Sequence, residues 1–479
     1  MKRVFEKSPS AMVSLIPLVV LAALLFLVIT AFGSDSINGG SQIALLSASS
    51  VCVMLATTLY NCSWRRLEDE IIENIRSSAS AIIILLLIGS IAGTWMVSGV
   101  VPTLICYGLK VIHPSWFLAA TCIICAVVSI MTGSSWTTIA TIGVALMGIG
   151  RAMGFSEGWI AGAIISGAYF GDKISLLSDT TVLASSTAGV PLFTHVRYML
   201  ITTIPSFVIA LLVFLIKSLS FAPTLDGESI IFSETLHESF NITPWLLLVP
   251  IITALLIARK LPAIVTLFVA TLLAALSIAI FQPHLLSELA GGATSNGFIT
   301  GFKGVLTACF GSTSLDTGVG EVNDLVSTRG MAGMMNTVWL ILCAMCFGGV
   351  MTGSGMLGAL TKLFLKFVRR TTTTVAATVG AGIFFNLATA DQYISIILTG
   401  RLFRDMYNKA GLEPRLLSRS VEDSATVTSV LVPWNSCGMT QATVLGISTF
   451  AYLPYCIFNY LSPLMSILVA ALGYKIYRK

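Results

Sequence analysis

Three ionisable residues lie inside an apolar stretch of this chain, where such side chains are rare. Asp172, Lys173 and Asp179 belong to the sequence GAYFGDKISLLSDTT at positions 167–181. A charged group at the centre of a membrane helix costs roughly 2.5–3.5 kcal/mol on insertion scales. Residues retained at that cost are typically those that bind an ion or a substrate. Two acids in this position therefore indicate a cation site.

Small and hydroxylated side chains surround these three residues. Such residues interrupt a transmembrane helix and make backbone carbonyls and hydroxyls available to an ion. In a continuous helix Asp172, Ser175 and Asp179 would share one face. Lys173 would project about 100° away from it and neutralise one acid when no ion is bound. The alternative is a buried Asp–Lys pair that only fixes packing, which leaves the second acid and the hydroxyl cluster unexplained.

Three more interruptions carry similar residues. Two are tips of re-entrant hairpins, Thr132-Gly133-Ser134-Ser135 and Thr389-Ala390-Asp391-Gln392. The third lies in a segment of about 421–449. In transporters, interrupted helices of this kind meet near the midplane of the membrane. We expect the first tip to face Ser175, Ser178, Asp179 and Thr180, and the second to face Thr428, Ser429, Asn435 and Ser436.

Carboxylate, amide, hydroxyl and carbonyl oxygens favour a hard cation over a transition metal. Asp179 and Asp391 are the Na+ candidates. Asp391 has three open roles: binding Na+, carrying a proton, or simply capping the second arm of its hairpin. The candidate ion- and substrate-binding residues are Thr132, Ser134, Ser135, Asp172, Ser175, Asp179, Thr180, Thr389, Asp391, Thr428, Ser429, Asn435 and Ser436, with Lys173 as charge partner.

Two other acids lie near the second broken helix. Glu422 and Asp423 come at its expected cytoplasmic start. We interpret them as an N-terminal cap pair, with an entry vestibule for ions as the alternative. Ser134 and Ser135 are expected to cap the outgoing arm of the first hairpin, whose positive end favours an anion or the Asp179 carboxylate.

Composition places the chain in a membrane. Of its 479 residues 56% are hydrophobic and 10% charged, and the mean hydropathy is +0.91. Several segments reach the roughly 20 apolar residues that cross a bilayer. The net charge of +5 indicates basic loops beside a membrane rather than nucleic-acid binding. The apolar run 11–32 is long for a signal peptide and is interpreted as a retained first helix.

Sequence motifs for other chemistries are missing. The ten cysteines lie almost all in apolar runs, and the four histidines are scattered. The C-x-x-C pairs at 122–125 and 343–346 therefore indicate core packing rather than metal binding. No phosphate-binding loop, zinc helix or serine-hydrolase elbow is recognisable. We expect no cofactor, no enzymatic activity and no ATP-driven transport by this chain alone.

The fold class expected is an all-α polytopic membrane protein. The expected helical segments are about 11–32, 43–61, an amphipathic 64–76, 79–98, 115–150 with its break, 159–190 with its break, 197–216, 244–258, 263–281, 336–355, 373–405 with its break, 421–449 with its break, and 454–475. A polar linker covers 217–243, and a polar, Gly-rich stretch covers 287–335. The expected organisation is a first repeat over 1–216, an extracytoplasmic linker over 217–243 and a second repeat over 244–479.

The two halves of the sequence repeat. GTWMVSG at 93–99 aligns with GVMTGSG at 349–355 at an offset of 256 residues. The same offset places Ser135 on Asp391, Asp172 on Thr428 and Asp179 on Asn435. Each half also carries a G-x-x-x-G pair suited to close helix packing, at 89–93 and 349–353.

Charge distribution then predicts the topology. If 115–150 and 373–405 are re-entrant hairpins and the N-terminus is cytoplasmic, residues 356–372 and 401–419 face the cytoplasm with nine cations. Their counterparts, 99–114 and 151–158, face outside with two, Lys110 and Arg151. This is the positive-inside bias. Each half then crosses the membrane five times. Because this number is odd, the second repeat starts on the opposite side of the membrane from the first, so the repeats are inverted and both termini are cytoplasmic.

In these residues, the chain resembles the NhaC-type Na+/H+ antiporters of the ion-transporter superfamily. The matching sequence motifs are MTGSSWTT at 131–138, GDKISLLSDTT at 171–181 and EDSATVTSVLVPWNSCG at 422–438. The resemblance covers nearly the whole chain. It implies secondary exchange of Na+ for H+ in a bacterial-type cytoplasmic membrane, and one branch of the family resembles Na+-linked malate/lactate exchangers. The family's prolines after the serine of each break are replaced here by Leu176 and Val430, and its usual Asn by Val182.

Two carrier functions and one other class remain open from the sequence. The carriers are a Na+/H+ antiporter and a Na+/H+-coupled exchanger of small organic acids, for which the Ser134-Ser135 tip is the carboxylate site. A channel requires a continuous polar stripe, and an intramembrane hydrolase requires a supported nucleophile; the polar residues here concentrate at paired breaks instead. The expected partners are Na+, H+, small carboxylates and the lipid bilayer, with a homodimer as an open assembly state and no nucleic acid.

Overall fold

The structure is a computed structural model, and most of it is helical. It describes residues 9–32, 38–220, 228–259, 261–292, 297–365 and 370–478. Eight helices there are long and apolar enough to cross a membrane, or up to eleven spans if each bent pair counts as one. In the described residues the β pairing consists of two isolated bridges, Thr313 with Thr328 and Leu412 with Arg478. The expected all-α membrane fold is confirmed.

In its described residues, the first half contains ten α-helices. They are α1 (Ala11–Phe32), α2 (Gly40–Tyr60), α3 (Trp64–Val97), α4 (Val100–Val111), α5 (Phe117–Thr132), α6 (Ser135–Thr138), α7 (Val144–Ala152), α8 (Glu157–Ile174), α9 (Asp179–Ala188) and α10 (Leu192–Leu219). Two short turns join them, η2 (Pro114–Trp116) and the π-helical η3 (Ile139–Gly143).

The remaining α-helices follow the linker region. They are α11 (Glu228–Ser239), α12 (Leu248–Ala258), α13 (Ala263–Phe281), α14 (Pro283–Leu289), α15 (Gly297–Phe310), α16 (Gly320–Val326), α17 (Gly330–Gly333), α18 (Met335–Gly353), α19 (Met356–Leu365), α20 (Thr371–Thr389), α21 (Gln392–Lys409), α22 (Pro414–Val421), α23 (Ser436–Leu445), α24 (Thr449–Tyr452) and α25 (Ile457–Ala471). The short turns are η4 (Pro244–Leu247), the π-helical η5 (Glu422–Thr426), η6 (Ser429–Leu431) and η7 (Leu453–Tyr455).

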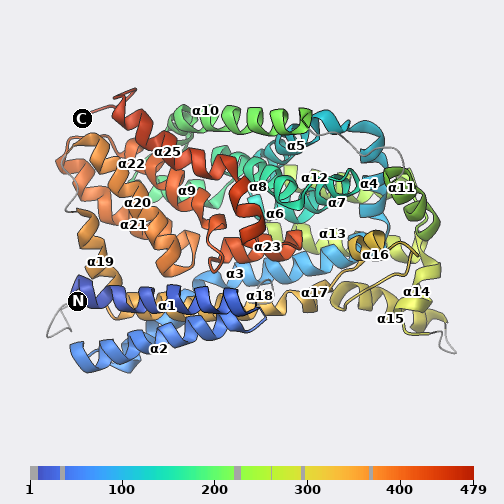
Figure 1. Cartoon of the computed structure of the whole chain (residues 1–479), viewed down its shortest axis with the longest axis horizontal. Coiled ribbons are helices and arrows are strands. Elements are labelled where there is room, and N and C mark those ends of the chain that lie inside the picture. The colour runs from blue at the N-terminus through green and yellow to red at the C-terminus, as the bar shows by residue number, and fades with distance from the viewer. Residues whose placement is uncertain are drawn as a thin grey trace.

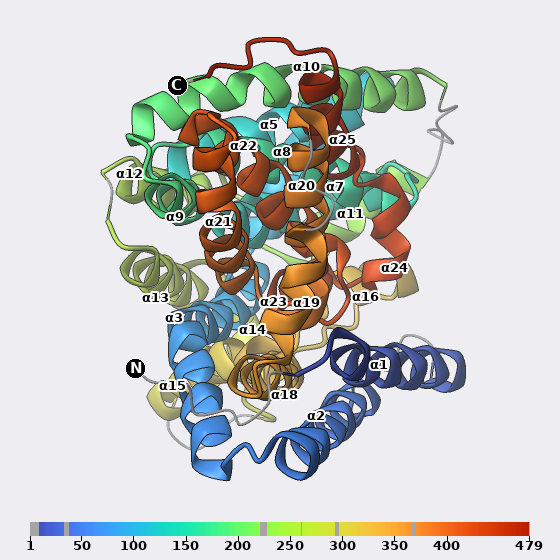
Figure 2. The ribbon, with the colours of Figure 1, turned by 90° about the vertical axis from the view of Figure 1, so that its left-hand side faces the viewer.

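The chain ends and the region between the halves lie at opposite ends of the molecule. Figure 1 shows both termini at the left, together with α19, and α4 and α11 at the right. Figure 2 looks at the bundle from the left end, with α1 and α2 at one edge and α10 at the opposite edge. One apolar core joins α1 and α2 to α3 and α18.

Several segments differ from expectation. The helix α4 lies in a stretch where no helix was expected, and the expected polar stretch 287–335 contains α15, α16 and α17. The amphipathic 64–76 and the span 79–98 form one 34-residue helix, α3, because no Gly or Pro separates them. The expected linker 217–243 contains the helix α11, while its residues 221–227 lie outside the described residues.

The close-packing glycines have the expected role. A Cβ atom at Gly93 would lie 2.1 Å from the Ala308 carbonyl oxygen, and one at Gly349 would lie 2.6 Å from Ile71 Cα. The tightest approach at the site is between α5 and α8, where a Cβ at Gly167 would lie 2.1 Å from the Cys122 carbonyl oxygen. This approach holds the first hairpin directly against the first broken helix.

Candidate functional site

The first hairpin tip is a short, self-capped turn. Gly133 ends α5 in the left-handed region at φ +66°, where a residue with a side chain is strained. Ser134 then caps the next helix by accepting a hydrogen bond from the Thr137 N–H at 3.2 Å. The Thr132 hydroxyl donates to the Ser134 carbonyl at 3.1 Å. The predicted capping role of Ser134 is confirmed, while Ser135 is the first residue of the capped helix α6.

This tip is hydrogen-bonded to the first broken helix. The Ser135 hydroxyl donates to Asp172 Oδ2 at 2.8 Å, and the Ser175 hydroxyl donates to the Ile130 carbonyl at 2.8 Å. Asp172 is only 3% exposed, and its second oxygen, Oδ1, has no hydrogen-bond partner among the described residues.

The first broken helix bends by 48° between α8 and α9. Ser178 caps α9 through the Thr181 N–H at 3.4 Å and shares a hydrogen bond of 2.9 Å with the Thr180 hydroxyl. Asp179 opens α9 and is exposed. Its Oδ2 accepts from the Tyr393 hydroxyl of α21 at 2.8 Å, so Asp179 contacts the second hairpin and lies at the edge of the buried site.

The second hairpin tip uses a carboxylate as its cap. Ala390 ends α20 in the left-handed region at φ +57°. Asp391 then accepts from the Ile394 N–H at 3.0 Å and from the Ser436 hydroxyl at 3.1 Å. It therefore caps α21 and links the tip to the second broken helix, with both carboxylate oxygens bonded.

The other predicted residues of the second half lie around this link. The Thr389 hydroxyl donates to the Asp391 carbonyl at 3.2 Å, and the Ser429 hydroxyl donates to Gln392 Oε1 at 3.1 Å. Asn435 caps α23 by accepting from the Cys437 N–H at 3.0 Å. Thr428 accepts from Asn386 Nδ2 at 3.0 Å. The structure thus brings tip and broken helix together in each half.

Equivalent contacts recur in the two halves at a constant spacing of 257 residues. Ser129 Oγ donates to the Ala168 carbonyl at 2.6 Å, and Asn386 Nδ2 donates to the Ala425 carbonyl at 2.7 Å. The Ser135–Asp172 hydrogen bond corresponds to that between Gln392 and Ser429. The left-handed residues that end α9 and α23, Gly189 and Gly446, follow the same spacing.

The predicted offset of 256 is therefore wrong by one residue at the site. It does hold at Ser98–Gly99 and Ser354–Gly355, where both glycines have positive φ, so the second half gains one residue before its hairpin tip. At the site, Asp391 corresponds to Ser134, Asp172 to Ser429 and Asp179 to Ser436. At these aligned positions the first half has its acids in the broken helix, and the second half has its acid, Asp391, at the hairpin tip.

Lys173 has a different partner from the one expected. It is fully buried and forms an ion pair with Asp423, 250 residues away in the sequence, and a hydrogen bond of 2.6 Å to the Ser462 hydroxyl. Asp423 Oδ1 also accepts from the Thr202 hydroxyl at 3.1 Å. The expected pairing of Lys173 with Asp172 or Asp179 is therefore wrong.

Glu422 and Asp423 are likewise not a cap pair. They begin the π-helical turn η5 in the continuous path from α22, and both are fully buried. The Thr180 hydroxyl donates to Glu422 Oε1 at 3.3 Å. Glu422 Oε2 has no hydrogen-bond partner among the described residues. The interpretation of Glu422 as a cap missed its burial, although an acid in a segment expected to cross the membrane carries the same insertion cost that identified Asp172.

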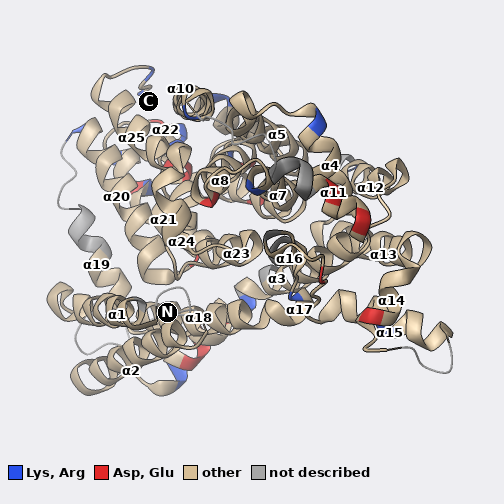
Figure 3. Ribbon diagram, turned by 45° about the vertical axis from the view of Figure 1, so that its right-hand side comes forward, with Lys and Arg blue, Asp and Glu red and all other residues tan. Residues whose placement is uncertain are grey.

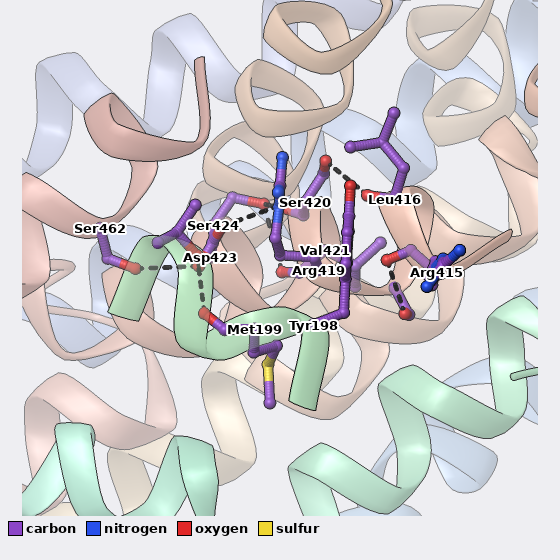
Figure 4. A network of polar contacts seen from close by, with 12 residues as sticks. Tyr198, Met199, Arg415, Leu416, Arg419, Ser420, Val421, Asp423, Ser424 and Ser462 are labelled. Atoms are coloured by element: carbon purple, nitrogen blue, oxygen red, sulfur yellow. Dashed lines mark hydrogen bonds and ion pairs between the residues drawn. The ribbon is translucent and has the colours of Figure 1, made fainter. Parts of the chain in front are cut away.

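Arg419 is a second buried cation near Asp423, and Figure 4 shows these two residues from close by. Its Nε lies 3.8 Å from Asp423 Oδ2, and its guanidinium lies 4.7 Å from the centre of the Tyr198 ring. None of its three nitrogens has a hydrogen-bond partner among the described residues. The positive-inside argument counted Arg419 as a cytoplasmic cation, but the structure buries it in the bundle.

The arrangement suits a small hard cation. Its buried donor atoms are carboxylate and hydroxyl oxygens from both halves. In the part of the chain that the structure describes, no group of three or more His, Cys, Asp or Glu side chains is placed to hold a metal ion. Figure 3 shows charged residues sparsely distributed through the bundle, with some on α8 and near α22.

Comparison with known proteins gives matches over nearly the whole chain. The profile of the Na+/H+ antiporter family matches residues 4–168 and 167–474. The Na+/H+ antiporter NhaC of Alkalihalophilus pseudofirmus is 36% identical over 428 residues, which is 88% of this chain and 89% of that protein.

Two other relatives carry different names. The malate-2H+/Na+-lactate antiporter of Bacillus subtilis is 36% identical over 416 residues, 86% of this chain and 85% of that protein. The arginine/ornithine antiporter ArcD of Halobacterium salinarum is 32% identical over 479 residues, 99% of this chain and 94% of that protein.

Proposed function

This chain belongs to the Na+/H+ antiporter family, and we propose that it exchanges Na+ for H+ across the cytoplasmic membrane by alternating access. The observation that carries the proposal is the contact between each hairpin tip and a broken helix, with acids and hydroxyls buried between them. Interrupted helices at the centre of a bundle are how secondary transporters form ion sites. The ion-binding residues proposed are those predicted from the sequence, with Asp391 and Asp172 at their centre.

A Na+ gradient should drive proton movement through the purified protein. The proteoliposomes contain a pH-sensitive dye. When Na+ is added outside, its uptake should be accompanied by proton release to the outside, and the lumen should become alkaline. Choline at the same concentration is the control for salt. A lumen pH that does not respond to Na+ in either direction contradicts the proposal.

Exchange of small organic acids is the second candidate, and Arg419 is the observation that favours it. A buried guanidinium with no hydrogen-bond partner matches the geometry of a carboxylate. Relatives of this chain are named for malate and lactate or for arginine and ornithine.

The same proteoliposomes distinguish the two functions. Proton flux that requires malate, lactate or arginine in addition to Na+ identifies an organic substrate, and flux with Na+ alone identifies the simple antiporter.

The proposed architecture has two inverted repeats, over 1–216 and 244–479, joined by an extracytoplasmic linker, with both termini in the cytoplasm. It is supported by the positions of the counterpart helices α4 and α19 at opposite ends of the molecule. The hairpins α5–α7 and α20–α21 then enter from opposite faces.

Labelling from the two sides tests this topology. Single cysteines at Arg370 and His113, in a background without native cysteines, should react with impermeant thiol reagents from opposite sides of the membrane. Arg370 should react only in inverted vesicles and His113 only in intact cells. Reaction of both from one side contradicts the inverted arrangement. A cysteine that labels only after detergent treatment in both preparations marks a buried position and is replaced by its neighbour.

A further inference from the structure

Three buried carboxylates have an oxygen with no hydrogen-bond partner in the described residues. That of Asp423, Oδ2, lies 3.8 Å from Arg419 Nε, which leaves two carboxylates, one from each half. They are Asp172 on α8, 3% exposed, and Glu422 on η5, 0% exposed. The oxygens concerned are Asp172 Oδ1 and Glu422 Oε2. An ionised oxygen in an apolar interior is unfavourable unless it is paired. Both oxygens therefore indicate a bound partner.

The two carboxyl groups belong to one site. Thr180 donates its hydroxyl hydrogen to Glu422 at 3.3 Å, and the next residue, Thr181, donates to the Asp172 carbonyl at 3.4 Å. Ser135 donates to the other oxygen of Asp172 at 2.8 Å. Both acids are therefore held at the first turn of α9. Like charges so placed repel unless a cation lies between them.

With its carboxylates ionised, the group of buried charges around the site sums to minus one. Asp172, Glu422 and Asp423 are negative, and Lys173 and Arg419 are positive. The buried His195, bonded to Ser418 at 2.8 Å, is counted as neutral because a third cation beside two others would be repelled. Outside this group, Asp179 is exposed, and Asp391 has the N-terminus of α21 as its own partner. One monovalent cation therefore neutralises the group.

We propose that Asp172 and Glu422 form a single site for one monovalent cation, which Na+ and H+ occupy in turn. Lys173, Arg419 and Asp423 are its fixed counter-charges, and the hydroxyls of Ser135 and Thr180 are neutral ligands. This inference rests on the proposed Na+/H+ exchange and assigns it a place between the two halves. Movement of one half relative to the other then changes two things at once: the access of ions to the site and the geometry of its ligands.

Removal of one acid should mimic an occupied site. In Glu422→Gln the group sums to zero without Na+. The purified variant should therefore melt at or above the temperature of the Na+-bound wild type, and its apparent Na+ affinity should fall more than about tenfold. The measurement is thermal unfolding of the full-length protein in detergent, over a range of NaCl with choline chloride at constant ionic strength.

A matched control uses an exposed acid. Glu157→Gln removes a carboxylate that bonds Arg151 at 2.8 Å and is half exposed, and it should keep the wild-type response to Na+. If Glu422→Gln fails to fold, Thr180→Val removes one hydroxyl and no charge, and it should weaken Na+ binding about fivefold. An unchanged Na+ affinity in the folded Glu422→Gln variant, or in Thr180→Val in its place, overturns the inference.

Competition supplies a second readout. Because one proton replaces one Na+, the apparent Na+ affinity of the wild type should fall about tenfold per pH unit on the acid side. A fall of about a hundredfold per unit indicates two protons and overturns the single-cation site. Absence of any Na+ response in the wild type contradicts Na+ exchange itself, so the failures of the two proposals are distinguishable.

Discussion

Replacement of Lys173 by Met is expected to destabilise the protein by about 3–5 kcal/mol, because it removes the closer of the two ion-pair partners of the buried Asp423. Asp423 keeps hydrogen bonds from Thr202 and Ser462, but Arg419 lies at 3.8 Å and makes no hydrogen bond to it. The buried group then carries an excess of two negative charges. The measurement is chemical unfolding of the purified variant in mixed micelles.

The double variant tests whether the pair is the cause. Lys173→Met combined with Asp423→Asn removes one charge of each sign and returns the group to the wild-type sum. We expect it to recover most of the lost stability, since a buried ion pair is often replaceable by neutral groups of similar size. A Lys173→Met protein as stable as the wild type, or a double variant no better than the single one, contradicts the assigned pairing.

Much of the fold could be predicted because apolar length and breaks determine it. The bounds of α1 and α13 agree with the expected segments, since each is an uninterrupted apolar run of spanning length. The breaks were also visible, because Gly133 and the capping residues Ser134 and Asp391 mark a helix end and a helix start. Helix length and helix capping depend on residues that are neighbours in the sequence, so they can be predicted from a single sequence.

The breaks are maintained without the family's prolines for the same local reason. Leu176 and Val430 occupy the proline positions, yet side-chain caps at Ser178 and Asn435 still start the following helices. Ser175 also bonds outward to the hairpin rather than along its own helix. A side-chain cap satisfies the free N–H groups at a helix start without a proline.

The partners of the charged residues could not be predicted in the same way. Adjacency suggested that Lys173 neutralises Asp172 or Asp179, but successive residues of a helix point in different directions. The Asp423 partner comes from the other half of the chain. The repeat register failed for a related reason: it was fixed at residues 93–99, and one extra residue lies between that motif and the second hairpin tip.

Asp391→Asn should abolish exchange and leave the fold intact. This variant separates the capping role of Asp391 from the two roles that need its charge, which are binding Na+ and carrying a proton. Asn is as good a helix cap as Asp. Its amide oxygen can accept from the Ile394 N–H, and its amide nitrogen can donate to the Ser436 hydroxyl. The stability should therefore change by less than about 1 kcal/mol. Only the negative charge is lost.

Asp391 is one of the ion-binding residues proposed from the sequence, in addition to the Asp172–Glu422 site. Na+-driven proton flux in Asp391→Asn proteoliposomes should therefore fall more than about a hundredfold, equivalent to about 2.7 kcal/mol. Asp405→Asn is the matched control, because it makes the same change at an exposed position on the same helix α21. Flux should be compared at equal amounts of folded protein, judged by gel filtration. Wild-type flux in Asp391→Asn would reduce Asp391 to a helix cap and leave the carboxylates of Asp172 and Glu422 to carry the exchange alone.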